Sequence, residues 1–521
     1  MSAAYAKSTS ADEMFSWAHE QMGKIVTELR SDKMLSAEHG EVESFVKEEG
    51  RELERLLYQA HLDVRAARER PVPVRGADNV ERTYRRPSRR PLGTILGRVM
   101  VTRLAYQALG VEGLHPMDAA LNLPPELYSH GVSRFVAEHA AMMAFDDVVG
   151  ELLTATGSAV GKRQVEEIAV RAAVDFEAFY KQRRAANDVV EETRDLLALT
   201  FDGKGIVMVP DDLRPATQKA AKKKGRSKLA TRLTAGEKRN RKRMAEVAAV
   251  YTVPRFVRTP LDIVADLYGE PDEQTRRERR ARRPLVRNKR VWASVEHDPQ
   301  VVIDEAFKEA EARDPKHRRV WVVLLDGNKD QLALSKAAAK KLGVEVTIVV
   351  DLMHALEYLW CAAHAFHDGD PKAAEQWVQQ RLLWLLQGRP AGKIATAMRR
   401  SASAAHLRDS RLDAVREAAN YLQKYAPYMR YGDAIEQGLP IATGVIEGAC
   451  RYLVKDRMDP GGARWTLDGA EAVLRLRALR ASGDFNDYWA FHLREELRRN
   501  HAERVERRRV HLHSRHLLVA R

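Results

Sequence analysis

The chain has 521 residues, of which 45% are hydrophobic and 31% charged, and Lys and Arg outnumber Asp and Glu by 87 to 73. This length predicts two to four domains, and the net charge of +14 favours a polyanionic partner. Two cysteines cannot form a disulfide framework, no apolar run suits a membrane span, and the N-terminus lacks a signal-peptide layout, so we expect a cytoplasmic protein without a membrane partner.

The first region, residues 1–92, is expected to be a helical arm followed by a basic linker. Residues 36–68 predict one amphipathic helix, which either dimerises or packs on its own domain. Its apolar residues recur at three- and four-residue steps: Val42, Phe45, Val46, Leu53, Leu56, Leu57 and Ala60. Residues 71–93 are rich in Pro, Gly and Arg, which predicts a linker, and a short strand is expected at about 95–103.

The second region, residues 93–190, is expected to be mostly helical and to bind DNA. Its segment FDDVVGELLTATGSAVGKRQVEEIAVRAA predicts a helix, a turn at Thr156–Gly157 and a second helix from Ser158 or Gly161. This order of helix, short turn and helix is typical of a helix-turn-helix, with Lys162 and Arg163 at the start of the second helix. Two packed helices without a DNA-reading role are the alternative interpretation.

Residues 191–351 change to buried strands and are expected to form an α/β core. Three strands are followed by helix, strand, helix and strand, which predicts a mixed five-stranded sheet covered by helices. The predicted strands are 196–203, 245–253, 290–298, 318–327 and 344–351. In this sheet the first and fourth strands lie side by side and parallel where the winding reverses, and chemistry concentrates beyond the carboxyl ends of strands there.

The remainder of the chain is expected to be helical. Residues 352–440 are rich in Ala, Leu and Trp and predict an all-helical segment. Residues 441–495 predict a helix that carries Glu447 and a following Leu/Arg helix, and residues 496–521 form a basic tail.

Asp202 and Asp326 are the first candidates for chemistry, because each closes an apolar strand and precedes a glycine. A glycine permits a sharp turn that leaves the carboxylate accessible. Cleaving and joining phosphodiesters suits two magnesium ions about 4 Å apart, which bind carboxylates and leave positions for water and phosphate. The alternative is that each acid only caps a turn.

Glu447 and the Asp351–His354 pair each have a functional and a structural interpretation. Glu447, in TGVIEGACRYLV, has small neighbours that allow close approach, or it is a surface residue paired with Arg451. Asp351 and His354 lie three residues apart at a strand end, as a metal or proton-handling pair, or as a helix N-cap with a packed histidine. Asp351 therefore competes with Asp326 as the second metal ligand.

The strongest polyanion feature is a basic insert between the first two strands. Glu237 is the only acid between residues 219 and 243, and phosphate contacts from such a patch would be strong and salt-dependent. A solvated face is the plain alternative. Its candidate DNA-binding residues are Lys222, Lys223, Lys224, Arg226, Lys228, Lys238, Arg239, Arg241, Lys242 and Arg243.

Several of these blocks together resemble one protein family. Between about residues 90 and 495 the chain is similar to the bacterial ISKra-type insertion-sequence transposases, relatives of the ISL and Mutator-like groups. The blocks that carry the resemblance are FDGKG, KLATRLTAGEKRNRKRMAEV, LLDGNKDQ, VVDLMHALEYLW and IATGVIEGACRYLVKDRMD with GGARW.

The resemblance implies an RNase H-like core with an all-helical insertion and an Asp-Asp-Glu triad. Mapped onto this chain, the triad is Asp202, Asp326 and Glu447, and Asp351 with His354 is an accessory pair. Expected cofactors are two Mg²⁺ ions, for which Mn²⁺ substitutes, and expected partners are double-stranded DNA at element ends and targets, and a second copy in a nucleoid-associated homodimer. A non-catalytic DNA-binding regulator and an RNase H-like nuclease remain alternatives.

Two details complete the expectation. Many relatives carry cysteine zinc motifs near the N-terminus, whereas residues 103–116 contain no cysteine, so we expect no zinc there. In the GGARW turn, Arg464 and Trp465 could contact DNA, or Trp465 could pack in the core.

Overall fold

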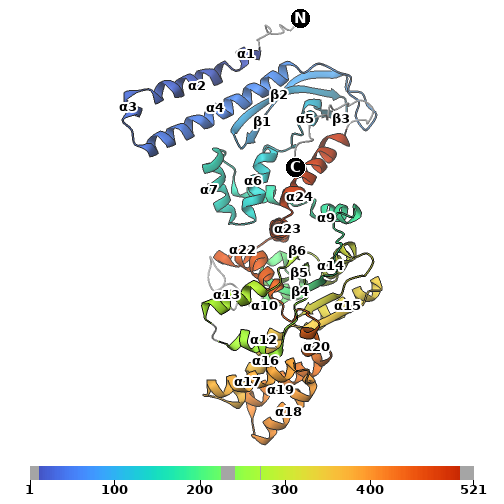
Figure 1. Ribbon diagram of the computed structural model, residues 1–521. Helices are drawn as coiled ribbons and strands as arrows, with labels where there is room; N and C mark the ends of the chain where they lie inside the picture. Colours follow the sequence, from blue (N-terminus) through green and yellow to red (C-terminus); the bar gives the residue numbers. More distant parts are fainter. Residues whose placement is uncertain (1–10, 224–240, 270–271, 505–521) are drawn as a thin grey trace. The chain divides into compact units, whose positions relative to one another are not determined.

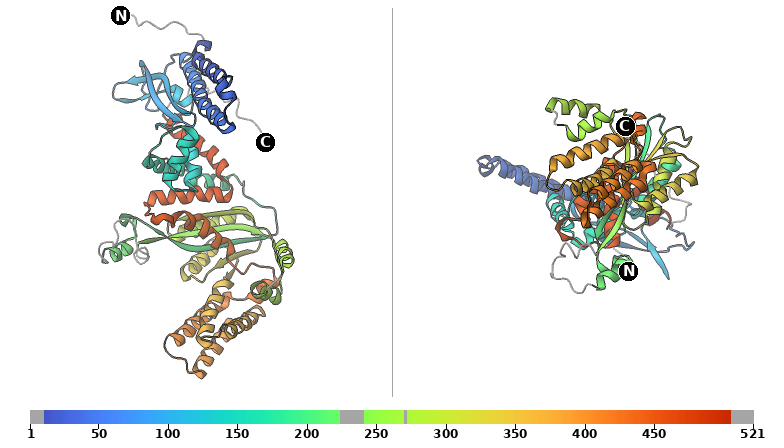
Figure 2. Two further views of the ribbon diagram at one scale, coloured as in Figure 1. Left: turned by 90° about the vertical axis from the view of Figure 1, so that its left-hand side faces the viewer. Right: turned by 90° about the horizontal axis from the view of Figure 1, so that it is seen from below.

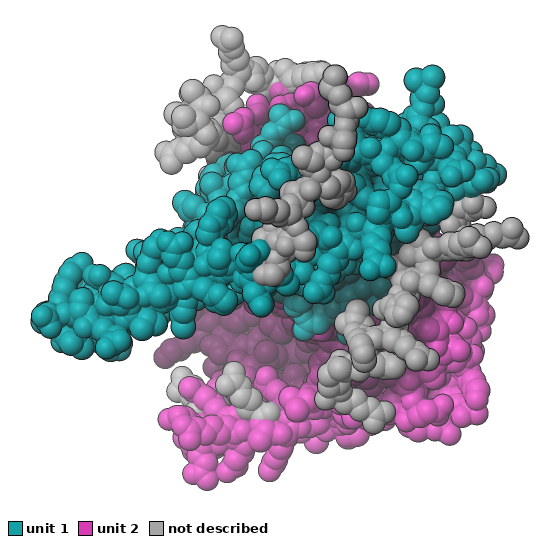
Figure 3. All heavy atoms as spheres, turned by 90° about the horizontal axis from the view of Figure 1, so that it is seen from above, with its two compact units in different colours: residues 1–179, 485–521 teal, residues 180–484 magenta. Residues whose placement is uncertain are grey.

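The computed structural model describes residues 11–223, 241–269 and 272–504. The chain forms two compact units, which Figure 3 distinguishes by colour. Unit 1 joins Met1–Phe179 to Phe485–Arg521, and unit 2 is Tyr180–Asp484. The finer division into six regions remains a prediction.

Unit 1 begins with helices and a three-stranded antiparallel sheet of order β1-β2-β3. The expected long helix is confirmed as α4, which packs against β2. These elements are α1 (Ala11–Met14), α2 (Ser16–Leu29), α3 (Asp32–Leu35), α4 (His39–Ala67), β1 (Tyr84–Thr94), β2 (Gly97–Ala108) and β3 (Val111–Leu114).

The expected linker over 71–93 is wrong in its second half, and the region from 93 is less helical than expected. Residues 84–94 form β1, paired with β2 along its whole length. Its prolines, Pro87 and Pro91, suggested a linker, but β1 is an edge strand, where a residue without a backbone N–H is tolerated. The sheet continues to Leu114, beyond the single short strand expected.

The rest of unit 1 is helical and contains the expected helix-turn-helix pair. Helix α7 ends at Gly157, which has a left-handed φ of 68°, and α8 begins after Gly161. The helices are α5 (Pro116–Ala120), α6 (His130–Ala140), α7 (Phe145–Thr156), α8 (Lys162–Ala172), α9 (Phe176–Ala185, which runs into unit 2), α24 (Phe485–Leu497) and η5 (Arg498–Ala502).

Unit 2 contains a mixed five-stranded sheet of order β6-β5-β4-β7-β8, which confirms the expected α/β class and strand count. The β4–β5 and β5–β6 pairs are antiparallel, and the β4–β7 and β7–β8 pairs are parallel. The strands are β4 (Leu196–Val207), β5 (Lys242–Val253), β6 (Arg287–Ser294), β7 (Trp321–Leu325) and β8 (Val346–Val350).

Helices cover the sheet and follow it in the chain. Helices α14 and α15 precede β7 and β8, and α16–α19 form a bundle beyond one end of the sheet (Figures 1 and 2). The elements are η1 (Pro210–Asp212), α10 (Pro215–Lys223), α12 (Pro260–Tyr268), α13 (Glu273–Arg282), α14 (Pro299–Arg313), α15 (Lys329–Leu342), α16 (Leu352–Phe366), α17 (Pro371–Leu386), α18 (Ala391–Ala404), α19 (Asp409–Tyr425), η2 (Ala426–Tyr428) and α20 (Tyr431–Glu436).

The chain after the bundle returns to the sheet in short pieces. Instead of one long helix, Glu447 lies on α21, which passes into a π-helical segment, η3. These elements are α21 (Gly444–Ala449), η3 (Cys450–Lys455), α22 (Asp456–Met458), η4 (Pro460–Gly462) and α23 (Leu467–Ser482). Among the described residues, no helix combines the length and apolar character needed to cross a membrane.

Candidate active site

Three aspartates lie at or just beyond the carboxyl ends of the pairing between three neighbouring parallel strands, β4, β7 and β8. Thr200 pairs with Leu324 in the last pair of the β4–β7 ladder, and Asp202 and Asp326 each come two residues after that pair. Leu325 pairs with Val350 between β7 and β8, so the next residues, Asp326 and Asp351, also correspond. Because strands in a sheet lie about 4.8 Å apart, the register sets these acids side by side.

Asp202 lies within its strand rather than at its end, which corrects the expectation from sequence. β4 continues to Val207 because its hairpin partner β5 pairs with it along the whole length. Its parallel pairing with β7 stops at Thr200, so Asp202 still lies beyond the carboxyl end of that ladder. The side chain accepts hydrogen bonds from the backbone N–H of Gly203 (2.6 Å) and from the thiol of Cys450 (3.1 Å).

Asp326 directly follows β7 and is held by the loop that leads into α15. Its Oδ1 accepts a hydrogen bond from the backbone N–H of Asn328 (2.8 Å), and its carbonyl accepts one from Tyr421 (2.7 Å). Gly327 has a φ of 97°, and a Cβ there would lie 2.8 Å from the Tyr421 hydroxyl. A glycine is therefore required at this position, as the sequence suggested.

Glu447 reaches the same region from α21, which packs with η3 against β4 and β5. Its side chain is exposed, and within the described part of the chain Arg451 pairs with Asp456 (3.6 Å) and not with Glu447. Burial raises the pKa of Glu447, and the negative charges of Asp351 and Asp202 raise it further. The surface ion pair considered as an alternative does not form.

Asp351 is fully buried and its carboxylate is occupied by structural contacts. It caps α16 by accepting a hydrogen bond from the Met353 N–H (2.9 Å), and it also accepts one from the hydroxyl of Thr443. The Nδ1 atom of His354 lies 3.4 Å from its second oxygen. Asp351 thus takes the N-cap role, which leaves Asp326 as the better candidate for a metal ligand.

The acids are grouped closely enough to affect one another's charge. Burial raises the pKa of Asp326, and the charges of Asp202 and Asp351 raise it further. Among the described residues, no three His, Cys, Asp or Glu side chains converge as metal ligands, so Asp202, Asp326 and Glu447 would have to turn toward a shared ion. The donor set still fits a hard divalent cation, because it consists of carboxylates whose mutual repulsion a cation would relieve.

Glu246 is a residue of this region that the sequence reasoning missed. It lies on β5 opposite Gly203, and it is 6% exposed. Burial raises its pKa to about 8, a hydrogen bond from Gln331 opposes this, and the charges of Asp202 and Asp326 add to it. A single acid inside the apolar strand AEVAAVYTV is the signal that could have identified it, since unpaired acids are rarely buried.

The Asp351–His354 contact makes a prediction for titration. The hydrogen bond with Asp351 raises the pKa of His354 to about 9, against an ordinary value of 6.5. The pair's contribution to stability is therefore complete below about pH 6.5 and is lost as the pH rises through about 9. We expect NMR titration of the metal-free protein to show His354 still protonated at pH 8, and Asp351→Asn to return its pKa toward 6.5. An unshifted His354 in the wild-type protein would contradict the contact.

Few of the candidate DNA-binding residues can be placed. The side chains of Lys222 and Lys223 and the residues Lys224, Arg226, Lys228, Lys238 and Arg239 lie outside the described residues. Arg241 and Lys242 are half-buried. Arg243 donates to the backbone carbonyls of Asp212, Val295 and Glu296, which gives it a structural role, and its contact with DNA remains a prediction.

Of the remaining candidate DNA-binding residues, three are exposed and one is buried. Lys162 and Arg163 are at the start of α8 and are exposed, although they pair with Asp146 (2.6 Å) and Glu167 (3.0 Å). Arg464 is exposed. Trp465 is 5% exposed and donates to the Met458 carbonyl, so it packs in the core, as the alternative interpretation expected, and cannot act as a surface contact.

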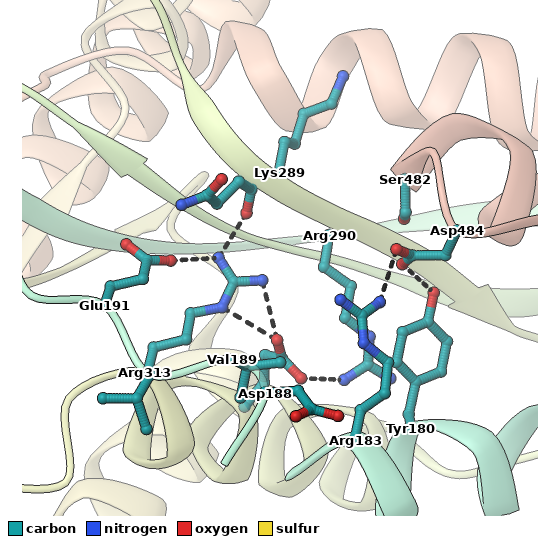
Figure 4. A pocket seen from close by; sticks show the side chains of 13 residues that line it. Tyr180, Arg183, Asp188, Val189, Glu191, Lys289, Arg290, Arg313, Ser482 and Asp484 are labelled. Atoms are coloured by element: carbon teal, nitrogen blue, oxygen red, sulfur yellow. Dashed lines mark hydrogen bonds and ion pairs between the residues drawn. The ribbon is translucent and has the colours of Figure 1, made fainter. Parts of the chain in front are cut away.

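A second polar feature of unit 2 is a pocket of about 270 Å³ lined by α9, β6 and α14 (Figure 4). Arg290 and Arg313 bind Glu309 there at 2.6 and 2.8 Å, and Arg183 binds Asp484 at 2.6 Å. Most of the charged side chains that line the pocket are therefore paired with one another, which favours a structural role over ligand binding.

No protein-family model and no curated protein matches the chain.

Proposed function

We propose that this protein is a transposase that cuts the ends of a DNA element and joins them to target DNA, using two Mg²⁺ ions at an RNase H-like core. The observation that carries the proposal is that Asp202 and Asp326 both lie two residues beyond the last pair of the parallel β4–β7 ladder, where the sheet changes from antiparallel to parallel. The resemblance of the sequence blocks to insertion-sequence transposases supports the same activity.

The proposed ligands are Asp202, Asp326 and Glu447. Asp202 would hold Mg²⁺ from β4, which lies between β5 and β7. Asp326 would hold it from the loop after β7, and Glu447 from α21. Bound Mg²⁺ would supply activation of the attacking oxygen and stabilisation of the leaving oxygen.

Other residues of the protein would orient the acids and bind the DNA. The Asn328 N–H and the Tyr421 hydroxyl donate hydrogen bonds that hold Asp326 on its loop. The Cys450 thiol donates a hydrogen bond that orients Asp202 in the absence of metal. Cations of the basic insert would bind DNA phosphates. Water would first attack the phosphodiester at the element end and break its P–O3′ bond, leaving a 5′-phosphate and a free 3′-hydroxyl. That hydroxyl would then attack a target phosphodiester and release a 3′-hydroxyl of the target strand.

An assay with labelled element ends, target DNA and Mg²⁺ tests this function against both rivals. We expect cleavage at the ends, followed by joined products. Cleavage without joining, and without preference for inverted ends, would favour an RNase H-like nuclease. Binding without cleavage would favour a DNA-binding regulator.

The basic insert makes a separate prediction about affinity. Replacing Lys222, Lys223, Lys224, Arg226 and Lys228 by Gln should weaken binding to all DNA sequences alike. Because each phosphate contact contributes about −0.9 to the slope of log K against log salt, we expect a clearly shallower slope. Fluorescence anisotropy at salt concentrations from about 50 to about 200 mM measures this slope. An unchanged slope would show that these cations do not contact phosphate.

A further inference from the structure

A buried side-chain pair connects β5 to α15 behind the acids. Glu246 Oε1 accepts a hydrogen bond of 2.7 Å from Gln331 Nε2, and the two residues are 6% and 2% exposed. In the β4–β5 ladder Val247 is opposite Asp202, whereas Glu246 is opposite Gly203, so Glu246 points to the other face of the sheet. The pair therefore lies behind Asp202 and not in front of it.

From Gln331 the hydrogen bonds continue to Asp326. The backbone N–H groups of Gln331 (3.3 Å) and Asp330 (2.9 Å) donate to Asn328 Oδ1, so Asn328 caps α15. The Asn328 N–H then donates to the carboxylate of Asp326 (2.8 Å). A continuous path runs from Glu246 through Gln331 and Asn328 to the second acid.

This path contacts the carboxylate of Asp326, whereas Tyr421 contacts its backbone carbonyl. The Tyr421 hydroxyl holds the carbonyl of Asp326, which leaves the carboxylate free to turn. Its orientation depends on the Asn328 N–H, and the position of Asn328 depends on the first turn of α15. Gln331 anchors that turn to the sheet through Glu246.

We propose that Glu246 and Gln331 are positioning residues that aim the Asp326 carboxylate at the metal site. This proposal rests on the proposed function. Residues that orient a metal ligand without touching the metal commonly change its affinity by 10- to 100-fold when they are replaced.

The protonation of Glu246 is consistent with this role. Burial and the nearby charges of Asp202 and Asp326 raise its pKa to about 8, so near neutral pH it is an uncharged carboxylic acid. The hydrogen bond to Gln331 needs only an acceptor oxygen. An amide at position 246 would therefore hold Gln331 equally well, which separates positioning from direct metal binding.

Mn²⁺ binding to the full-length protein, measured by isothermal titration calorimetry, tests the proposal. We expect Gln331→Met to weaken Mn²⁺ binding about ten-fold, because it keeps the side-chain length and removes the donor. Glu246→Gln should bind Mn²⁺ as the wild type does. Gln300→Met is the matched control, since Gln300 is an exposed residue on α14 whose side chain donates a hydrogen bond to Asp304.

The outcomes are distinct. Wild-type affinity in a folded Gln331→Met overturns the positioning role alone, and a ten-fold loss in Glu246→Gln replaces it with direct metal binding by Glu246. Absence of Mn²⁺ binding by the wild type overturns the proposed function as well. If Gln331→Met does not fold, Asn328→Ala tests the same path, because it removes the acceptor that anchors α15 and retains the backbone N–H.

Discussion

Asp202→Asn and Asp326→Asn should each lower Mg²⁺-dependent cleavage and strand transfer by about 1,000-fold or more. A divalent ion at the reacting phosphate contributes several kcal/mol, and about 1.4 kcal/mol corresponds to a factor of ten. Asparagine retains the size of the side chain and removes the charge that holds the ion. Single-turnover rates on labelled element ends measure the effect, and anisotropy should show DNA binding retained.

Two controls accompany these variants. Asp330→Asn changes an exposed acid four residues beyond Asp326, and it should leave the rate unchanged. Asp351→Asn should retain metal-dependent cleavage, because Asp351 serves as the N-cap of α16. If Asp326→Asn carried out strand transfer at the wild-type rate, Asp326 would not be the metal ligand. If Asp351→Asn also lost all strand transfer, Asp351 would take that role.

Glu309→Gln should be the most destabilising single substitution of a charged residue in unit 2. Glu309 is 2% exposed and binds both Arg290 and Arg313, which are themselves buried. Removing one partner of a buried ion network leaves the others uncompensated, at a cost of about 3–5 kcal/mol. Urea unfolding followed by circular dichroism measures the loss, and Glu311→Gln on the same helix should change little.

The same network predicts that the free energy of unfolding depends on pH in the acid range. Burial alone would raise the pKa of Glu309, but Arg290 and Arg313 lower it to about 2, against an ordinary value of 4.5. Its contribution to stability is complete above about pH 4.5 and is lost as the pH falls toward 2. Glu309→Gln should therefore differ from the wild type most at neutral pH, and the two should converge near pH 2. Equal stability at pH 7 would contradict the network.

The sequence predicted the core of unit 2 well because its strands are apolar runs that end at clear turns. The five strands and their mixed pairing followed from the order of the elements. The end of β4 was placed too early, because the acid at Asp202 suggested an end while the partner strand β5 continued the ladder. β1 was missed because its arginines and prolines obscure an edge strand.

The candidate site could be predicted only in part. Asp202 and Asp326 were identified from strand position, whereas Glu447 came from the family resemblance and not from its local pattern. The contacts of Cys450, Thr443 and Gln331 join positions at least 85 residues apart along the chain, which no local pattern reports. The hydrogen bonds of Arg243 and the burial of Trp465 are not revealed by a charge run or a turn motif.

The central claim is that Asp202, Asp326 and Glu447 share one divalent-cation site. Anomalous X-ray diffraction from crystals of the full-length protein grown with Mn²⁺ and an element end tests it most directly. We expect two anomalous peaks roughly 4 Å apart, with carboxylate oxygens of all three residues at about 2.2 Å. Peaks elsewhere, or no peak between Asp202 and Asp326 in crystals whose DNA is bound, would contradict the claim.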